Sequence, residues 1–271
     1  MTSRFAPFAA AALVLALMGC GGLPNDNAVD DNGIGNSQLD DVAETASVSR
    51  VSAIDLSETT PLLEFQYLIP PEAAAVPAVR DMMTAQAAKL KASALKAAKA
   101  DEESSRETGF TYRQHSDGTR WSAAADTKGL LALQGEHFFY TGGAHPMTNH
   151  LALIYDRKAK QRISFNDLFT DPQQSVPPLA GRYCAALDKE REKRRGGPTN
   201  PDELFGDCPK LSEAAMLPAS ATPGRIDRIR IILDPYVAGP YVEGTYVIEL
   251  PVDQPMIDAV KPQYRSLFVV R

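Results

Sequence analysis

The chain has 271 residues, of which 44% are hydrophobic, and it carries a formal net charge of −6. This size and apolar content provide enough chain for one large or two small globular domains. The acidic balance argues against a nucleic-acid-binding protein, because contacts with phosphates need a basic surface.

The first twenty residues predict export. Arg4 is followed by an apolar run from Phe5 to Met18 and then by Gly19-Cys20. A basic start, a short apolar stretch and a small residue are typical of a secretory signal, whereas a membrane-spanning helix needs about 20 apolar residues. We therefore predict a signal peptide over residues 1–19.

The segment "LMGC" (residues 17–20) resembles a bacterial lipobox, which implies that Cys20 is lipidated and becomes the new amino terminus. The acyl chains on Cys20 would anchor the protein stably to a membrane. The alternative is an ordinary signal peptide that contains a cysteine. Gly21 follows instead of an aspartate, which resembles Gram-negative lipoproteins of the outer membrane, so we expect an envelope lipoprotein that faces the periplasm.

Residues 20–60 have the composition of a tether. They are poor in aromatic residues, and their one basic residue, Arg50, stands against eight acidic residues: Asp26, Asp30, Asp31, Asp40, Asp41, Glu44, Asp55 and Glu58. Such a segment buries too little apolar surface to offset its chain entropy, so we predict that it is disordered. Because the tether carries the negative charge of the exported chain, the remainder is close to neutral.

Cys184 and Cys208 remain once Cys20 is assigned to lipidation. An even pair of cysteines outside the cytoplasm favours a structural disulfide. Closing a loop of this length would stabilise the fold by about 3 kcal/mol through the entropy of the unfolded chain. Two free thiols or a redox pair are the alternative, although the sequence has no CxxC motif.

The first half of the module predicts a strand, a long helix and a meander. "LLEFQYLIP" (residues 62–70) is expected to form the opening strand. From Glu72 to about Glu103 the chain is dominated by Ala, Lys, Met and Leu, without Gly or Pro after Pro77, which favours a helix. Segments suited to antiparallel strands follow at residues 109–118, 119–126, 128–143 and 149–165.

The second half partly repeats this order. "SFNDLF" (residues 164–169) leads to a predicted helix from about Pro178 to Arg195, which ends at Gly196-Gly197. We interpret its charged end, "DKEREKRR", as a solvated helix end whose late basic residues suit the helix dipole, with an anionic partner as the alternative. Strands are then predicted in "RIDRIRIILDPY", "GTYVIELP" and "SLFVVR", and a short helix in "VDQPMIDAV".

This order of elements predicts an α+β fold, with antiparallel sheets, packed helices and two sequential strand–helix–strands units. We place the boundary between the units after residue 155. The sequence thus predicts two α+β subdomains, over residues 61–155 and 156–271.

The segment "YTGGAHP" begins at Tyr140 and looks like either a turn or a reactive loop. Gly142 and Gly143 allow the positive φ values of a tight turn between strands, in which His145 would hydrogen-bond a backbone carbonyl. In the functional alternative, the glycines hold His145 on an exposed loop that faces a partner or a saccharide. We favour the structural role and keep these residues as candidates for binding.

The segment "DPYVAGPYVEG" raises the same question for Tyr236, Gly239 and Tyr241. The two tyrosines are expected to pack and to cap a turn. The alternative is that they serve recognition, because tyrosine is common at wet interfaces.

Motifs for catalysis, metals and cofactors are missing from the sequence. His137, His145 and His150 would be the obvious zinc ligands, but their spacing matches no common zinc motif. The GxSxG elbow, the GxGxxG loop and the P-loop are absent as well. A pair of carboxylates for glycoside cleavage remains an alternative, because such a pair is defined by its geometry, which the sequence does not display. We therefore predict no metal, no cofactor and no catalytic residue.

Three segments occur in the order "YTGGAHP", "LALIYDRKAKQRISFNDLF" and "LDPYVAGPYVEGTYVIELP". Together they resemble the extracytoplasmic region shared by RsiV-type anti-sigma factors and PdaC-type peptidoglycan deacetylases. The resemblance covers about residues 62–271. The sequence departs from the family pattern in two places. An Asn often closely follows the "GGAHP" segment in the family, whereas here Met147-Thr148 intervene before Asn149, and a cysteine-bearing insertion lies between residues 196 and 211. Both departures weaken the assignment of the family's contact residues to positions in this chain.

The resemblance implies a binding module. In the anti-sigma type this region binds lysozyme outside the membrane, and in the deacetylase type it is an accessory region before a separate catalytic domain. We expect this chain to hold the extracytoplasmic module on a lipid anchor, without the sigma-binding, transmembrane and catalytic portions.

The resulting hypothesis is a non-catalytic module that binds a lysozyme-like protein or peptidoglycan, held at the membrane through Cys20. One alternative is a peptidoglycan-acting enzyme with His145 and a nearby carboxylate as acid and base. The other is a structural envelope lipoprotein without a ligand.

Overall fold

A computed structural model describes residues 51–271, which belong to one compact unit. The predicted signal peptide, Cys20 and most of the predicted tether lie outside the described residues. None of the helices within residues 51–271 is both long and apolar enough to cross a membrane.

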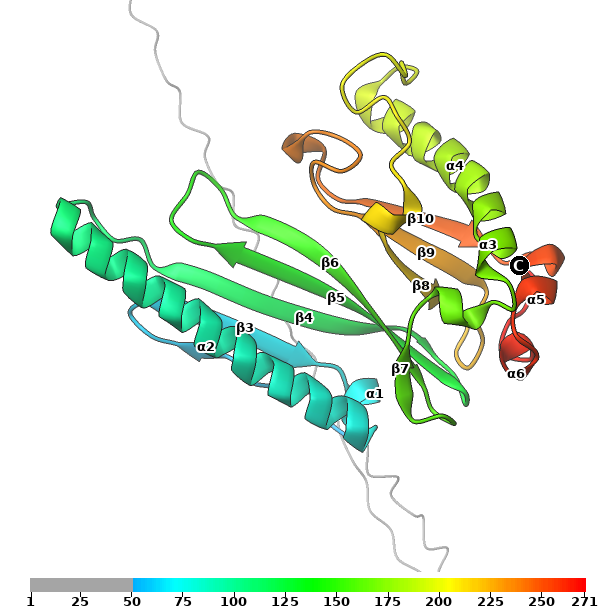
Figure 1. The fold of residues 1–271 in the computed structure, drawn as a ribbon, viewed down its shortest axis with the longest axis horizontal. Coiled ribbons are helices and arrows are strands. Elements are labelled where there is room, and N and C mark those ends of the chain that lie inside the picture. Colours follow the sequence, from blue (N-terminus) through cyan, green and yellow to red (C-terminus); the bar gives the residue numbers. More distant parts are fainter. Residues whose placement is uncertain (1–50) are drawn as a thin grey trace, which may run out of the picture. The chain divides into compact units, whose positions relative to one another are not determined.

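The larger of two sheets has seven strands (Figure 1). Their order across the sheet is β1 (Ile54–Asp55), β3 (Leu63–Ile69), β4 (His115–Asp126), β5 (Leu130–Tyr140), β6 (Met147–Asp156) and β7 (Gln161–Ile163), with β2 (Glu58–Thr59) also paired to β3. Most pairs are antiparallel, whereas β3 and β4 run parallel because a helix crosses between them.

That crossover is α2 (Pro77–Thr108), which follows the short helix α1 (Pro71–Ala74). Its Ala-rich sequence favours a helix, Pro77 suits the first turn, and Gly109 ends the helix with a left-handed φ of +76°. The buried residues Val79 and Met83 pack onto one face of the large sheet. Figure 1 shows α2 running along that face.

The end of the predicted tether belongs to the sheet. The composition predicts disorder up to residue 60, but β1 and β2 pair with β3. The reason is apolar burial, because Ile54 and Leu56 pack against the core beneath α2. An ion pair between Glu58 and Lys91 adds a contact with α2.

The smaller sheet has the order β10 (Tyr246–Pro251), β9 (Arg228–Leu233) and β8 (Ala215–Ala219). The remaining elements of the second half are η1 (Asn166–Leu168), α3 (Pro172–Ser175), α4 (Pro177–Arg195), η2 (Leu211–Glu213), η3 (Tyr241–Glu243), α5 (Gln254–Ala259) and α6 (Pro262–Arg265). Of these helices, α4 packs against β10.

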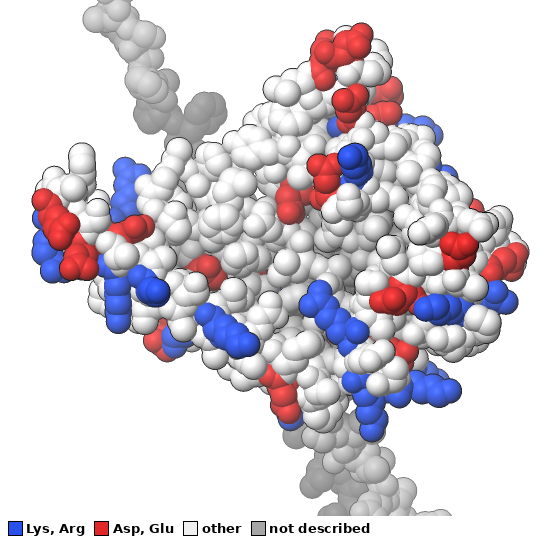
Figure 2. Space-filling model, in the orientation of Figure 1, with Lys and Arg blue, Asp and Glu red and all other residues white. Residues whose placement is uncertain are grey.

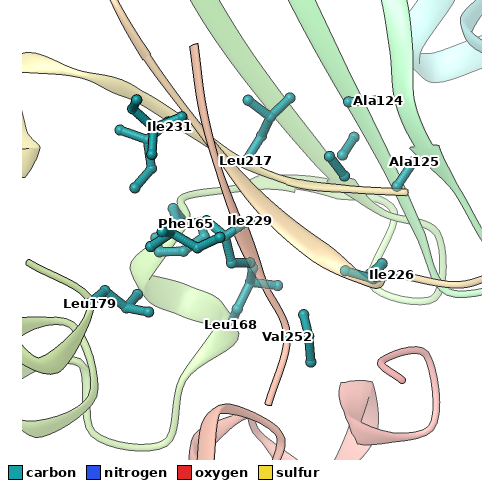
Figure 3. Close-up of a cluster of buried hydrophobic side chains, with 14 of the residues drawn as sticks. Ala124, Ala125, Phe165, Leu168, Leu179, Leu217, Ile226, Ile229, Ile231 and Val252 are labelled. Carbon is teal, nitrogen blue, oxygen red and sulfur yellow. The ribbon is translucent and has the colours of Figure 1, made fainter. Parts of the chain in front are cut away.

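One strand contributes to both hydrophobic cores. Because successive side chains of a strand point to opposite faces, Leu131 and Leu133 of β5 join the core beneath α2, whereas Leu130 joins the second core. The second core lies between the two sheets and the helices of the second half (Figure 3). It includes Leu217 and Ile229, and both are fully buried.

The predicted α+β class is confirmed, with the parallel β3–β4 pair as an addition to the expected antiparallel sheets. Strand β8 was not predicted, because Pro218 interrupts its pattern; as an edge strand, it tolerates the missing donor. The strand predicted for residues 266–271 is wrong, since that segment makes one isolated bridge, between Phe268 and Ile226. The division after residue 155 stays a prediction.

Candidate binding surface

Two loops that are distant in the sequence meet through aromatic side chains. The first loop joins β5 to β6 and holds His145, and the second joins β9 to β10 and holds Tyr236 and Tyr241 (Figure 1). The ring of His145 stacks on that of Tyr241 at 4.0 Å between centroids, and the ring of Tyr236 lies 5.7 Å from that of Tyr241. We call these three residues the aromatic surface.

Hydrogen bonds fix the geometry of the aromatic surface. The hydroxyl of Tyr241 donates to the carbonyl of Pro146 at 2.8 Å. His145 Nδ1 lies 2.9 Å from the same carbonyl, which can only accept, so Nδ1 carries the hydrogen. His145 Nε2 is then the acceptor for the hydroxyl of Tyr236, at 3.4 Å.

The backbone of each loop contains a left-handed residue. Gly142 has a φ of +86°, as a tight turn requires, whereas Gly143 is not among the positive-φ residues of the described chain. Tyr236 has a φ of +71°, which is uncommon for a bulky residue. Its amide donates to the carbonyl of Gly239 at 3.1 Å. Such strained positions persist where surrounding contacts hold them, and they gather at binding sites.

The aromatic surface is open to solvent. Tyr236 is 48% exposed, and Val242, which follows Tyr241, is 90% exposed. Tyr140 lies apart from the three rings, at the end of β5, where Arg113 donates to its hydroxyl at 3.3 Å. Of the candidate residues, His145, Tyr236 and Tyr241 therefore come together, Gly142 and Gly239 shape their loops, and Tyr140 does neither.

The basic end of α4 holds the second loop, which we call the tyrosine loop (residues 234–245). Arg195 forms a bidentate ion pair with the Glu243 carboxylate, at 2.9 and 3.0 Å. Arg194 donates to the carbonyls of Glu243 and Thr245, and its guanidinium lies 3.8 Å above the ring of Tyr246. Bidentate pairs of this kind fix orientation as well as position.

Arg191, one turn earlier on α4, is fully buried and donates to the carbonyl of Ala238 at 3.0 Å. The interpretation of "DKEREKRR" as a solvated helix end is therefore wrong for Arg191, whereas Arg194 and Arg195 are exposed and also bond to the tyrosine loop. Arginine is the side chain best suited to this role, because its five N–H donors can satisfy several carbonyls at once.

Gly239 is the point at which the tyrosine loop packs against Glu243. A Cβ atom at this position would overlap the Glu243 carboxylate. We expect Gly239→Ala to displace Glu243 from Arg195 and to lower the free energy of unfolding by about 1–3 kcal/mol, as overpacking does. Urea unfolding measures the change. Gly143→Ala is the control, because its Cβ would have no neighbour within 4 Å; equal losses in the two variants would contradict the packing argument.

Acid should release the same contact. The Arg195 hydrogen bond, together with one from Tyr246, holds the pKa of Glu243 below its ordinary value of 4.5. A carboxylate with a lowered pKa stabilises the fold above its unfolded pKa and loses this effect as the pH falls through the folded pKa. We expect the carboxyl carbon-13 NMR signal of Glu243 itself to stay constant from pH 7 to pH 5 and to titrate below pH 4.5. Glu243→Gln should abolish this transition, and a transition above pH 5 would contradict the assignment.

The three histidines considered as zinc ligands point to different partners. His137 lies 3.3 Å from Asp117, and His150 lies 2.8 Å from Asp234. In residues 51–271, no three His, Cys, Asp or Glu side chains are grouped as metal ligands.

A cleft of about 470 Å³ opens beside His150 and Asp234, lined also by Gln86, Trp121 and Arg162. One carboxylate oxygen of Asp234 accepts from both the backbone and the ring Nδ1 of His150. This contact joins β6 to the first residue of the tyrosine loop, 84 positions away, and sequence reasoning missed it. The only hint in the sequence was Asp234 itself, which stands in "LDP" directly after a predicted strand.

The predicted disulfide between Cys184 and Cys208 is present. It ties the segment after α4 to the middle of that helix. The segment and the tyrosine loop are thus both held by α4.

Comparisons with known proteins agree with this fold. Residues 56–148, about a third of the chain, match the family model described as deacetylase PdaC, which confirms the resemblance to PdaC-type proteins for that part of the chain. No protein of curated function matches.

Solved structures with a similar fold include two members of the DUF3298 family. A member of the DUF3298 family from Bacteroides fragilis is 17% identical, with 79% of this chain and 95% of that chain covered and a TM-score of 0.50. A DUF3298 family protein from Pseudomonas aeruginosa is 19% identical, with 82% and 98% covered and a TM-score of 0.45. At 17% identity, the first of these structures supports the fold alone.

Proposed function

We propose that this PdaC-like module is a non-catalytic binding module of the cell envelope, anchored through Cys20, which binds a lysozyme-like protein or peptidoglycan through the aromatic surface. The similarity to PdaC-type and DUF3298 proteins is typical of an extracytoplasmic, envelope-associated domain. The lipobox and the acidic tether motivate the anchor.

The observation that carries the proposal is the convergence of His145, Tyr236 and Tyr241 on an exposed surface. Tyrosine gives a large rigid contact area with a polar end, and it is enriched among residues that dominate binding energy. The arginines of α4 fix the tyrosine loop before any ligand arrives, which lowers the entropy lost on binding.

Charge gives no reason to prefer a nucleic acid. Acidic and basic side chains are interspersed on the face shown in Figure 2, and a broad part of that face carries neither. Binding through packed aromatic rings and hydrogen bonds therefore fits this module better than phosphate neutralisation.

Calorimetric titration of the purified protein with lysozyme and, separately, with soluble muropeptides tests the proposal. Saturable binding of either ligand supports it and identifies the class. If neither ligand binds, the proposed function is wrong.

A second candidate function is a peptidoglycan-acting enzyme, and one observation favours it. Within residues 51–271 the ring of His145 bonds to no carboxylate, but His150 is oriented by Asp234 beside a cleft, as a general base would be. If acid–base chemistry occurs, His150 is the residue to test. Muropeptide profiles after incubation with the wild type and with His150→Gln discriminate the two functions. A profile that the wild type leaves unchanged would exclude the enzymatic function.

A further inference from the structure

The fully buried Arg191 connects the tyrosine loop to the segment that precedes Cys208. Its Nε donates to Ala238 of the tyrosine loop at 3.0 Å, while Nη1 donates to Gly206 at 3.2 Å and Nη2 to Asp207 at 2.9 Å. These three acceptors are backbone carbonyls, and Nη1 also donates to the Asp188 carboxylate, one turn earlier on α4, at 3.3 Å. A buried guanidinium needs its donors satisfied, so loss of one set of acceptors disturbs the other.

The second set of acceptors is held by the disulfide. Gly206 and Asp207 directly precede Cys208, which is bonded to Cys184. Cys184 lies seven residues before Arg191 on α4, which is two turns, so both side chains lie on one face of the helix. The disulfide therefore places the two carbonyls opposite Arg191.

Arg195 repeats the connection. It donates to the carbonyl of Phe205 at 3.4 Å and to that of Ala238 at 3.2 Å. In the segment that precedes Cys208, Leu204 is 84% exposed, whereas Gly206 is buried beneath the arginine contacts. The disulfide and the two arginines therefore hold this segment beside α4.

We infer that the Cys184–Cys208 disulfide, acting through Arg191 as a positioning residue, controls the order of the tyrosine loop, so that the aromatic surface is formed in the oxidised protein and loosened in the reduced one. The consequence for binding rests on the proposed function. Reduction by a dithiol transfers two electrons and two protons to the disulfide, giving two cysteine thiols and the oxidised, cyclic form of the reductant. Arg191 then loses the carbonyls of residues 206 and 207, which leaves its guanidinium, and with it the bond to Ala238, less firmly held.

Hydrogen exchange of the full chain, with and without dithiothreitol, tests this without any ligand. Reduction is expected to raise the exchange of amides 236–244 about tenfold or more, while amides of β4, β5 and β6 keep their protection. Cys184→Ser/Cys208→Ser should behave as the reduced protein does in both conditions. Arg191→Met should raise loop exchange with the disulfide intact, and Arg191→Lys should do so less.

Arg182→Met is the matched control. Arg182 also lies on α4, but it donates to Asp253 and to the carbonyl of Pro251, at the other end of the helix. It should leave the tyrosine loop unchanged. Equal loop exchange in the oxidised and reduced protein would overturn the inference. So would an equal rise in the loop and in β4–β6, because the disulfide would then stabilise the module as a whole.

The same samples separate this inference from the proposed function. If loop exchange rises on reduction but neither lysozyme nor muropeptides bind the oxidised protein, the proposed function fails and the inference stands. If a ligand binds equally well in both redox states and loop exchange does not change, the inference fails and the proposed function stands.

Discussion

Tyr241→Ala is expected to weaken ligand binding about 30-fold, which corresponds to about 2 kcal/mol and is typical of a tyrosine at the centre of an interface. The substitution removes the ring that stacks on His145 at 4.0 Å. It also removes the hydroxyl that ties the tyrosine loop to Pro146 at 2.8 Å. The variant therefore loses both the contact area of the ring and the hydrogen bond that orders the loop before binding. Calorimetry with the ligand identified for the wild type measures the loss of affinity.

Two variants separate these contributions. Tyr241→Phe keeps the stacked ring and loses the hydroxyl, so we expect a several-fold loss, between the wild type and the alanine variant. Val247→Ala, on the half-exposed side of β10, should bind as the wild type does. A Tyr241→Ala variant with unchanged affinity would show that the ligand binds elsewhere.

Leu217→Ala is expected to lower the free energy of unfolding by about 3–4 kcal/mol, the largest change in stability that we predict. Leu217 is fully buried in β8, which contacts β4, β5 and β6 of the large sheet as well as β9 of its own. Truncation leaves a cavity where the two sheets meet (Figure 3). Urea unfolding measures the loss, which should appear as a lower midpoint with an unchanged slope.

Val247→Ala serves as the reference here too, and should change stability by less than about 0.5 kcal/mol. A loss below about 1 kcal/mol for Leu217→Ala would mean that the contact between the sheets contributes little. The large sheet would then have to be stabilised mainly by the core beneath α2.

The sequence predicted the elements whose signals are local. The Ala-rich composition and Pro77 indicated α2, and Gly196 marked the end of α4, where it has a left-handed φ of +74°. The alternating pattern indicated β5, β6 and β10. In each case the residues that define the element lie within it or beside it, so no distant contact was needed.

Other features depend on contacts that a sequence does not display. The parallel pairing of β3 with β4 follows from the path of α2, and the pairing of β1 and β2 follows from the burial of Ile54 and Leu56. The pattern of residues 266–271 suggested a strand, but the segment makes a single bridge, at Phe268. Periodicity alone cannot show that a partner strand is missing.

The candidate site was predicted as a set of residues, and its geometry was not. The motifs named His145, Tyr236 and Tyr241, but only the fold brings together rings more than 90 positions apart. The arginines of α4 that hold the tyrosine loop were not predicted, because basic residues late in a helix are usually explained by solvation and by the helix dipole. Arg191 differs from its neighbours in being buried, which its sequence context does not reveal.

Mapping of amide NMR shifts during titration with the ligand tests the central claim most directly. We predict that lysozyme or a muropeptide shifts the amides of residues 141–146 and 234–245, and that the triple variant His145→Ala/Tyr236→Ala/Tyr241→Ala, still folded, loses these shifts. Shifts confined to other residues, such as those lining the cleft beside Trp121, or undiminished shifts in the triple variant, would contradict it.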